Sequence, residues 1–230
     1  MKTKRTEIII GELVAAMDFS FKASSVVDNL DGTYTLESCN TKHLQSGYVV
    51  TINAIDYTIT AVDVDESITI MGSILPTLLT FDVYQPFYKY GTIITTNNEL
   101  DKESDALDIL PLVYLRTEFE ETINDRDSSM DRESPVEIFF LTQNDFSLTE
   151  SEIENNGVLP MRNLAEMFIE SLKNNKDIGK FENHRIKNWL RFGFETQNGA
   201  TKKIFNYCDM SGCQLSITLP ISRNLACCKN

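Results

Sequence analysis

The sequence predicts an α+β protein: a small antiparallel β module followed by a larger domain with one long helix. Two observations carry this prediction. From about residue 25 to residue 72, apolar side chains recur at every second position, the period of strands with one buried face. In the second half, one amphipathic segment at 158–174 lies among short apolar runs that are typical of strands. With 230 residues and a hydrophobic fraction of 42%, the chain can fill one large core or two small ones.

A short helix is expected before the β module. In the segment 6–17, Ile9, Leu13 and Ala16 recur at helical spacing, with further apolar residues beside them. Gly11 in the middle disfavours this helix by about 1 kcal/mol relative to alanine.

Inside the β module, the pair Asp31-Gly32 is a turn signal between alternating segments and predicts a β-hairpin. Further strands are expected at 48–52, 57–62 and 67–72. Because no helix separates these strands, they should pair antiparallel and form a small sheet or barrel.

Residues 73–108 are expected to connect the two parts. The run 92–95 suggests another extended segment or a long arm, and the polar, acidic stretch 97–108 is typical of an exposed linker. The expected organisation is therefore residues 1–75 for the helix and β module, 76–108 for an extended arm or linker, and 109–230 for the second domain.

In the second domain, we expect one long helix packed on a mostly antiparallel sheet. The run 136–141 is apolar enough for a central strand, and the helix 158–174 places its apolar residues on one face. Residues 109–115 form a short apolar segment, and other strands are expected at 183–195, 203–207 and 214–221, with a turn at Asn198-Gly199. The charged segments 116–134 and 142–157, including Glu150, Glu152 and Glu154, are interpreted as solvated loops.

The charge of the chain restricts its partners. Thirty-four acidic residues against 21 basic ones give a formal net charge of −13, which argues against a general nucleic-acid binder. No apolar run reaches the roughly 18–20 residues that span a bilayer, so no membrane contact is expected. The basic start is followed by an interrupted apolar stretch without a cleavage site, which favours a mature N-terminus.

No complete catalytic, cofactor or metal motif is found, so we expect neither an enzyme nor a cofactor. The odd number of cysteines without an export signal is typical of free thiols in a reducing compartment. Their spacing lacks paired zinc knuckles, and both histidines, His43 and His184, are interpreted as structural. The cysteines are Cys39, Cys208, Cys213, Cys227 and Cys228.

The charged run 116–134 is interpreted as a contact with another subunit, because mixed charge of this kind is typical of solvated or interfacial loops. The alternative is a metal-binding, nuclease-like carboxylate cluster that includes Glu133, although the Gly and terminal Glu of a calcium loop are missing. The candidate residues are Asp125, Arg126, Asp127, Asp131 and Arg132.

One dense aromatic patch is the second candidate interface. Burial between domains or subunits is the favoured interpretation, and a stacking platform for sugars or bases is the alternative. The patch consists of Tyr84, Phe87, Tyr88 and Tyr90.

Several motifs carry a resemblance to a known group of proteins. The first half contains the motif 29–36 (NLDGTYTL), continued by Gly47 and by 49–57. The second half contains the motifs 112–115, 125–129, 136–141, 160–165, 204–206 and 212–215, with the closing strand. Together they cover roughly two thirds of the chain and resemble virion proteins of tailed phages that infect Bacteroidetes, including crAss-like phages.

This resemblance implies a structural protein of the phage neck or tail. The second half is similar to tail-terminator and tail-completion proteins, which form rings between the portal or connector and the tail tube. The resemblance thus implies a homo-oligomeric ring in the virion, assembled in the host cytoplasm, that contacts portal, connector and tail proteins. During genome ejection DNA would pass through it without specific binding, and acidic loops would repel the DNA backbone. The β module and the length depart from minimal members of that class.

Two other functions stay open at this point. A carbohydrate- or receptor-binding virion module is suggested by the β-rich first half and the aromatic patch. A metal-dependent hydrolase would use Asp125, Asp127 and Asp131.

Overall fold

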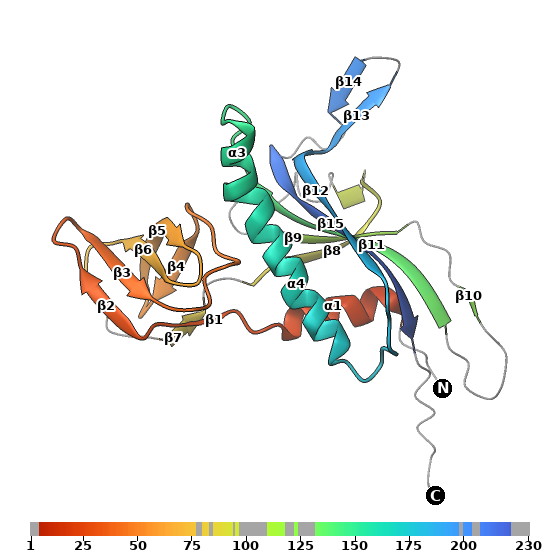
Figure 1. Ribbon diagram of the computed structural model, residues 1–230, viewed down its shortest axis with the longest axis horizontal. Helices are drawn as coiled ribbons and strands as arrows, with labels where there is room; N and C mark the ends of the chain where they lie inside the picture. The colour runs from red at the N-terminus through yellow and green to blue at the C-terminus, as the bar shows by residue number, and fades with distance from the viewer. Residues whose placement is uncertain are drawn as a thin grey trace, which may run out of the picture.

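The computed structural model describes residues 5–76, 80–82, 85–93, 95–96, 110–117, 122–123, 132–197, 200–203 and 208–221. A β module lies at one end and a C-terminal α+β domain at the other (Figure 1). The predicted α+β class is confirmed: antiparallel sheets form the N-terminal part, and a helical segment of 24 residues packs on a mixed sheet in the C-terminal part.

The β module is built from hairpins that follow one another in the sequence. Its main sheet has the order β2-β3-β6-β5-β4, and every pair in it is antiparallel, as predicted. The strands are β2 (Ser25–Asp28), β3 (Thr33–Glu37), β4 (Val49–Ile52), β5 (Ile55–Asp63) and β6 (Ser67–Met71). The predicted turn joins β2 to β3, and Gly32 adopts a φ of 84° there, which glycine accommodates without strain.

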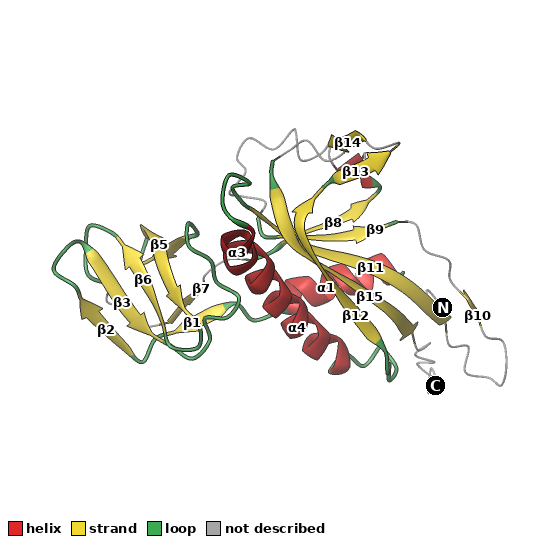
Figure 2. Cartoon of the chain, turned by 45° about the horizontal axis from the view of Figure 1, so that its top comes forward, coloured by secondary structure: helices red, strands yellow, loops and turns green. Residues whose placement is uncertain are grey.

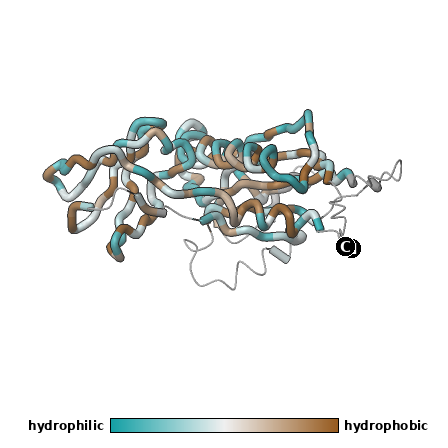
Figure 3. Tube along the Cα trace, turned by 90° about the horizontal axis from the view of Figure 1, so that it is seen from below, coloured by the Kyte–Doolittle hydropathy of each residue, from teal (hydrophilic) through white to brown (hydrophobic). Residues whose placement is uncertain are grey.

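A second, two-stranded sheet completes the β module. Strand β1 (Ser20–Lys22) pairs with β7 (Thr80–Asp82), which places the stacked rings of Phe21 and Phe81 in the core of the module. Along the main sheet, alternate residues such as Leu36, Ile59 and Ile68 are fully buried in that core. Figure 3 shows the resulting alternation of hydrophobic and hydrophilic stretches along the strands.

The C-terminal sheet has the order β12-β15-β11-β9-β8. Its pairs are antiparallel except β8 with β9, which is parallel. The strands are β8 (Phe87–Gly91), β9 (Leu112–Arg116), β11 (Arg132–Gln143), β12 (His184–Phe192) and β15 (Met210–Ile221), and β10 (Thr122–Ile123) pairs with the start of β11. The apolar run 136–141 lies in a central strand, as predicted, because β11 is paired on both sides.

The predicted arm or linker at 76–108 differs from the structure where the structure describes it. Strand β7 returns to the β module, and β8 joins the C-terminal sheet as the parallel partner of β9. A parallel pair needs a crossover connection, so the two strands are not adjacent in the sequence. The residue pattern of the short segment 87–91 therefore does not predict its pairing with β9.

The long helix begins earlier than the sequence predicts. Helix α3 (Glu150–Ile153), a π-helical turn η2 (Glu154–Val158) and helix α4 (Leu159–Lys173) run on continuously. The predicted helix 158–174 is confirmed, whereas the interpretation of 150–157 as loop is wrong. Thr149 and Glu152 form a reciprocal capping box that starts the helix, and of the α3 side chains only Ile153 is buried, so the apolar pattern is faint there.

Helix α1 (Thr6–Ala16) packs on the C-terminal sheet, not on the β module with which the sequence analysis grouped it. Ile9, Ile10 and Leu13 belong to the same core as Phe168 of α4. Figure 2 shows α1 and α4 on the same side of the sheet. Gly11 faces the Tyr88 ring, and a Cβ at this position would lie 2.8 Å from Tyr88 Cε1. The glycine that weakens the helix is therefore what lets β8 approach it.

A short hairpin extends from the C-terminal domain (Figure 1). It consists of β13 (Phe194–Gln197) and β14 (Ala200–Lys203), which pair antiparallel across the predicted turn. Gly193, with a φ of 83°, separates it from β12.

Within the described part of the chain, no helix has the length and apolar character that crossing a membrane requires.

Candidate functional site

The face of the C-terminal sheet opposite α1 and α4 carries a groove that is rich in basic and aromatic side chains. Its volume is about 440 Å³. We call it the basic groove and define it by Arg116, Glu137, Phe139, Arg185, Lys187, Trp189, Phe194 and Gln214, which are among the residues that line it.

Strand periodicity brings these residues together. Arg185, Lys187 and Trp189 alternate along β12 and thus point to the same side of the sheet. In the ladder, Lys187 pairs with Gln214 of β15, and Gln214 pairs with Phe139 of β11. Two residues along each strand, in the next row on the same face, Arg185 pairs with Ser216, and Ser216 pairs with Glu137. Two adjacent rows across three strands therefore form the floor of the groove.

Hydrogen bonds and a cation–π contact hold the indole ring in place. Trp189 Nε1 donates to Gln214 Oε1 at 3.2 Å, and Gln214 Nε2 donates to Ser216 Oγ at 3.3 Å. Lys187 Nζ lies 4.0 Å from the centroid of the Trp189 ring. Contacts of this kind contribute about 0.5–1 kcal/mol at exposed sites. The ring is thereby fixed on the floor with a positive charge directly above it.

The groove is electropositive although the chain has a net charge of −13. Three cations, Arg116, Arg185 and Lys187, face one carboxylate, Glu137. Arg116 Nη1 lies 3.4 Å from Glu137 Oε2. Arg185 and Lys187 form no ion pair with any residue that the structure describes. Two uncompensated cations beside an ordered indole can bind an anionic group.

Most of the charged candidates from the sequence lie outside the described residues. This applies to Asp125, Arg126, Asp127 and Asp131, and also to Tyr84. For Arg132, the structure describes the backbone, which pairs with Ile123 and Ile221 at the start of β11.

The three described members of the aromatic patch do not form one platform. They lie on β8, where side chains alternate between the two faces of the sheet. Tyr88 packs toward α1 and donates from its hydroxyl to Glu7 O at 2.8 Å, and burial raises the pKa of this phenol. Phe87 contacts the core on the opposite face, and Tyr90 is 39% exposed.

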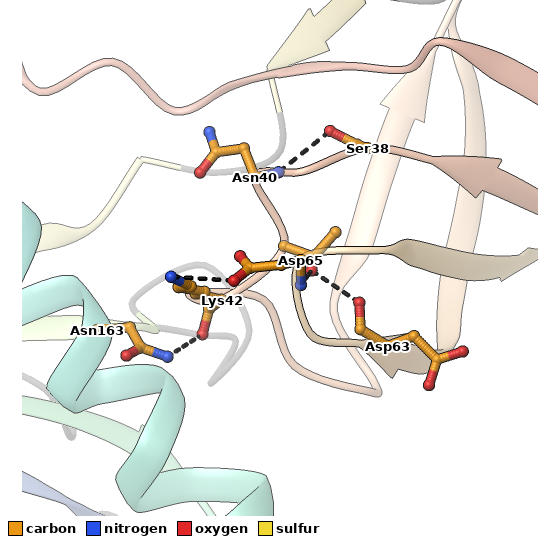
Figure 4. A network of polar contacts seen from close by, with 7 residues as sticks. Ser38, Asn40, Lys42, Asp63, Asp65 and Asn163 are labelled. Carbon is orange, nitrogen blue, oxygen red and sulfur yellow. Dashed lines mark hydrogen bonds and ion pairs between the residues drawn. The ribbon is translucent and has the colours of Figure 1, made fainter.

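A second polar region joins the β module to the long helix (Figure 4). Asn163 Nδ2 of α4 donates to Lys42 O at 2.6 Å. Thr41 Oγ1 donates to Asp63 O at 2.8 Å and accepts from Asp65 N at 2.7 Å, while Lys42 Nζ lies 3.0 Å from Asp65 Oδ2. These contacts hold the loop after β3 against α4 and thus set the position of the module.

His43 is buried at the same junction. Its ring centroid lies 6.1 Å from that of Phe19, and burial lowers the pKa of the imidazole to about 4. His43 is therefore neutral at physiological pH.

The described cysteines are free thiols. Cys39 is exposed, and burial raises the pKa of both Cys208 and Cys213 to about 12. Cys213 Sγ donates to Met161 O at 3.4 Å inside the core. Among the described residues, no three His, Cys, Asp or Glu side chains gather closely enough to hold a metal ion.

The basic groove could not be predicted from the sequence because its cations come from β9 and β12, which are far apart in the chain. One local signal was present: Arg185, Lys187 and Trp189 alternate in a segment that was correctly predicted as a strand. Only the sheet order shows that Arg116 and Glu137 lie beside them.

No family model, no curated protein and no solved structure matches the chain.

Proposed function

We propose that the protein is a non-catalytic structural component of a tailed-phage virion that forms a ring in the neck or tail. In this role it acts as a head-to-tail connector or tail terminator, contacts portal and tail proteins, and lets DNA pass during ejection. The resemblance of its motifs to phage virion proteins motivates the proposal. The structural observation that carries it is the β13–β14 hairpin.

This hairpin has the form of an arm that needs a partner surface. Among the described strands, β13 and β14 pair only with each other. A single two-stranded hairpin is marginally stable in water, so an extended one gains stability when it packs on a neighbouring subunit. Its base is anchored, since the Phe194 ring packs at a tilt beside Phe146 with centroids 6.0 Å apart and Lys203 Nζ lies 2.8 Å from Asp209 Oδ1.

The remaining features favour assembly over catalysis. Strands β8 and β12 are the two edges of the C-terminal sheet among the strands described, and sheet edges present backbone groups to further strands. Closed rings repeat one heterologous contact around an axis, which requires two different surfaces on each subunit. An arm on one side and a receiving surface on another satisfy that requirement.

The decisive experiment shortens the arm. Phe194 and Lys203 are partners in the ladder, so a two-residue Asn-Gly turn in place of residues 195–202 can close the chain without moving either residue. We expect rings of the wild-type protein in mass photometry and negative-stain images, and monomers of the shortened variant. The control is Leu30→Gly, which changes an exposed turn in the β module and should assemble like the wild type.

Loss of assembly by the shortened variant counts only if the variant still folds. Circular dichroism should show the same fold and melting temperature for the shortened variant, because β13 and β14 pair only with each other and the hairpin extends away from the domain. A wild-type protein that stays monomeric and is absent from purified virions would contradict the proposal.

A carbohydrate- or receptor-binding module is the second candidate. The ordered Trp189 beside Gln214 and Glu137 favours it, because sugars stack on aromatic rings and bond to such polar groups. Binding on a glycan array that is lost in Trp189→Ala would support this role. The residues invoked for a metal-dependent hydrolase lie outside the described part of the chain, so this alternative gains no support from the geometry.

A further inference from the structure

The basic groove needs an anionic partner, and its dimensions and charge restrict what that partner is. The groove has three cations, and two of them lack a described carboxylate partner. Three cations neutralise at most three phosphates, and the affinity of such a site for a nucleic-acid backbone falls steeply as salt rises. A short carboxylate-bearing segment of a protein matches both the volume and the charge better.

The chain itself carries such a segment at the start of the long helix. Glu150, Glu152 and Glu154 are all exposed in α3 and η2, and Asp145 precedes them. No ion pair joins any of these four carboxylates to a described lysine or arginine. Hydrogen bonds from Thr149 and Ser147 lower the pKa values of Glu152 and Asp145, so these two groups are charged at neutral pH. We call residues 145–154 the acidic turn.

One edge of the basic groove reaches the end of the sheet where the acidic turn lies, but the two surfaces are on different sides of the sheet. Figures 1 and 2 show α3 continuing α4 on the helix-covered side. The groove lies on the opposite face, where Phe194 lines it. Phe194 also contacts Phe146 of the acidic turn, with ring centroids 6.0 Å apart, so the Phe194 edge of the groove lies next to the acidic turn. Two complementary surfaces on different faces of one subunit can meet in a head-to-tail contact between ring subunits.

We propose that the basic groove of one subunit binds the acidic turn of the neighbouring subunit in the ring. This inference rests on the proposed function, since it names a further contact between the ring subunits, beside that of the hairpin. Arg185 and Lys187 supply the attraction, and Trp189 supplies the surface on which the helix start packs. The contact places opposite charges together between subunits that otherwise repel each other through their net charge of −13.

A charge exchange tests this contact. Arg185→Glu with Lys187→Glu should raise the dissociation constant of the ring at least about tenfold, because like charges then face each other. Glu150→Lys with Glu154→Lys should have the same effect. The protein that carries all four substitutions should assemble again, because the attraction is restored with its direction reversed. Mass photometry over a dilution series measures all of these proteins.

The matched control is Lys176→Glu with Lys180→Glu, which changes the net charge by the same amount. Both lysines are exposed and follow α4, at the opposite end of the long helix from the acidic turn. This control should assemble like the wild type. If the groove variant fails to fold by circular dichroism, Arg185→Gln with Lys187→Gln removes the charges without reversing them and takes its place.

The outcomes separate this inference from the proposed function. If the wild type forms rings and the groove variant forms them equally well, the inference is overturned and the proposed function stands. If the wild type stays monomeric and is absent from virions, the proposed function fails. Trp189 is the sole tryptophan and reports directly on the groove. If a 12-nucleotide single strand quenches its fluorescence at physiological salt while the rings are unaffected by groove substitutions, the groove belongs to nucleic acid, and the inference is overturned.

Discussion

The β module and the C-terminal domain use strands in different ways. In the module, β2 pairs with β3, β4 with β5 and β5 with β6, so most of its pairings connect neighbours in the sequence. In the C-terminal domain, β8 pairs in parallel with β9, and β15 lies between β11 and β12. Local pairing leaves its pattern in the sequence, whereas non-local pairing depends on the whole chain. The proposed contact surfaces all lie in the C-terminal domain.

The largest expected effect comes from the C-terminal core. Phe168 is fully buried, and its ring centroid lies 5.6 Å from that of Phe140. Phe168→Ala should lower the free energy of unfolding by about 3–5 kcal/mol, through lost burial and the cavity left behind. Urea unfolding followed by Trp189 fluorescence measures this effect, because Trp189 lies in the same domain.

Leu36→Ala is the matched change in the core of the β module, where Leu36 is fully buried. If the two parts unfold independently, this variant should leave the Trp189 transition in place while circular dichroism shows an earlier second transition. An equal shift of both signals would mean that the two parts unfold as one cooperative unit. The two parts would then differ in how their strands pair but not in when they unfold.

A pH dependence is expected at the junction between the two parts. Because burial lowers the pKa of His43 to about 4, the unfolded chain takes up a proton at a higher pH than the folded protein does. The stability from a neutral His43 is fully present above about pH 6.5 and is lost as the pH falls toward 4. The loss should reach up to about 3 kcal/mol.

Urea unfolding between pH 7 and pH 4 measures this dependence. His43→Leu removes the titrating group and should flatten the profile over this range. His184→Leu, a change at an exposed position, should retain it. A profile that is identical in the wild type and in His43→Leu would assign the acid sensitivity to the carboxylates instead.

Two glycine substitutions sharpen the comparison between local and tertiary constraints. Gly11→Ala should destabilise by about 1–2 kcal/mol, because the clash with Tyr88 outweighs the better helix propensity. Combining it with Tyr88→Leu should remove most of that cost.

Gly32→Ala should destabilise by about 1 kcal/mol for a local reason: its φ of 84° is unfavourable for alanine although no atom lies nearby. Thermal unfolding of the three variants separates the two causes, and a stabilising Gly11→Ala would contradict the packing argument.

The smallest expected effect concerns the helix start that the sequence analysis missed. Thr149→Ala removes the capping box with Glu152 and should lower the free energy of unfolding by about 1 kcal/mol. Thr149→Ser keeps the hydroxyl and should behave like the wild type. If Thr149→Ala unfolds at the same urea concentration as the wild type, then packing of Ile153 alone holds this turn.

The sequence by itself determined what depends on neighbouring residues. It indicated α1, the hairpins of the β module, the buried face of α4 and the central position of residues 136–141, because burial of an apolar face imposes a period of two or 3.6 on the residues that make it. It also indicated free thiols, since the count of cysteines is odd and no export signal was found, and the described cysteines Cys39, Cys208 and Cys213 are free.

Only the tertiary structure decided which distant segments meet. It placed α1 beside α4, made β8 the parallel edge strand and brought Arg116 of β9 to the same surface as Arg185 and Lys187 of β12. Such contacts join segments dozens of residues apart, and their free energy comes from the shape of a shared core, which no local period encodes. The basic groove exists for this reason: alternation along β12 could be read from the sequence, but the strands that lie beside β12 could not.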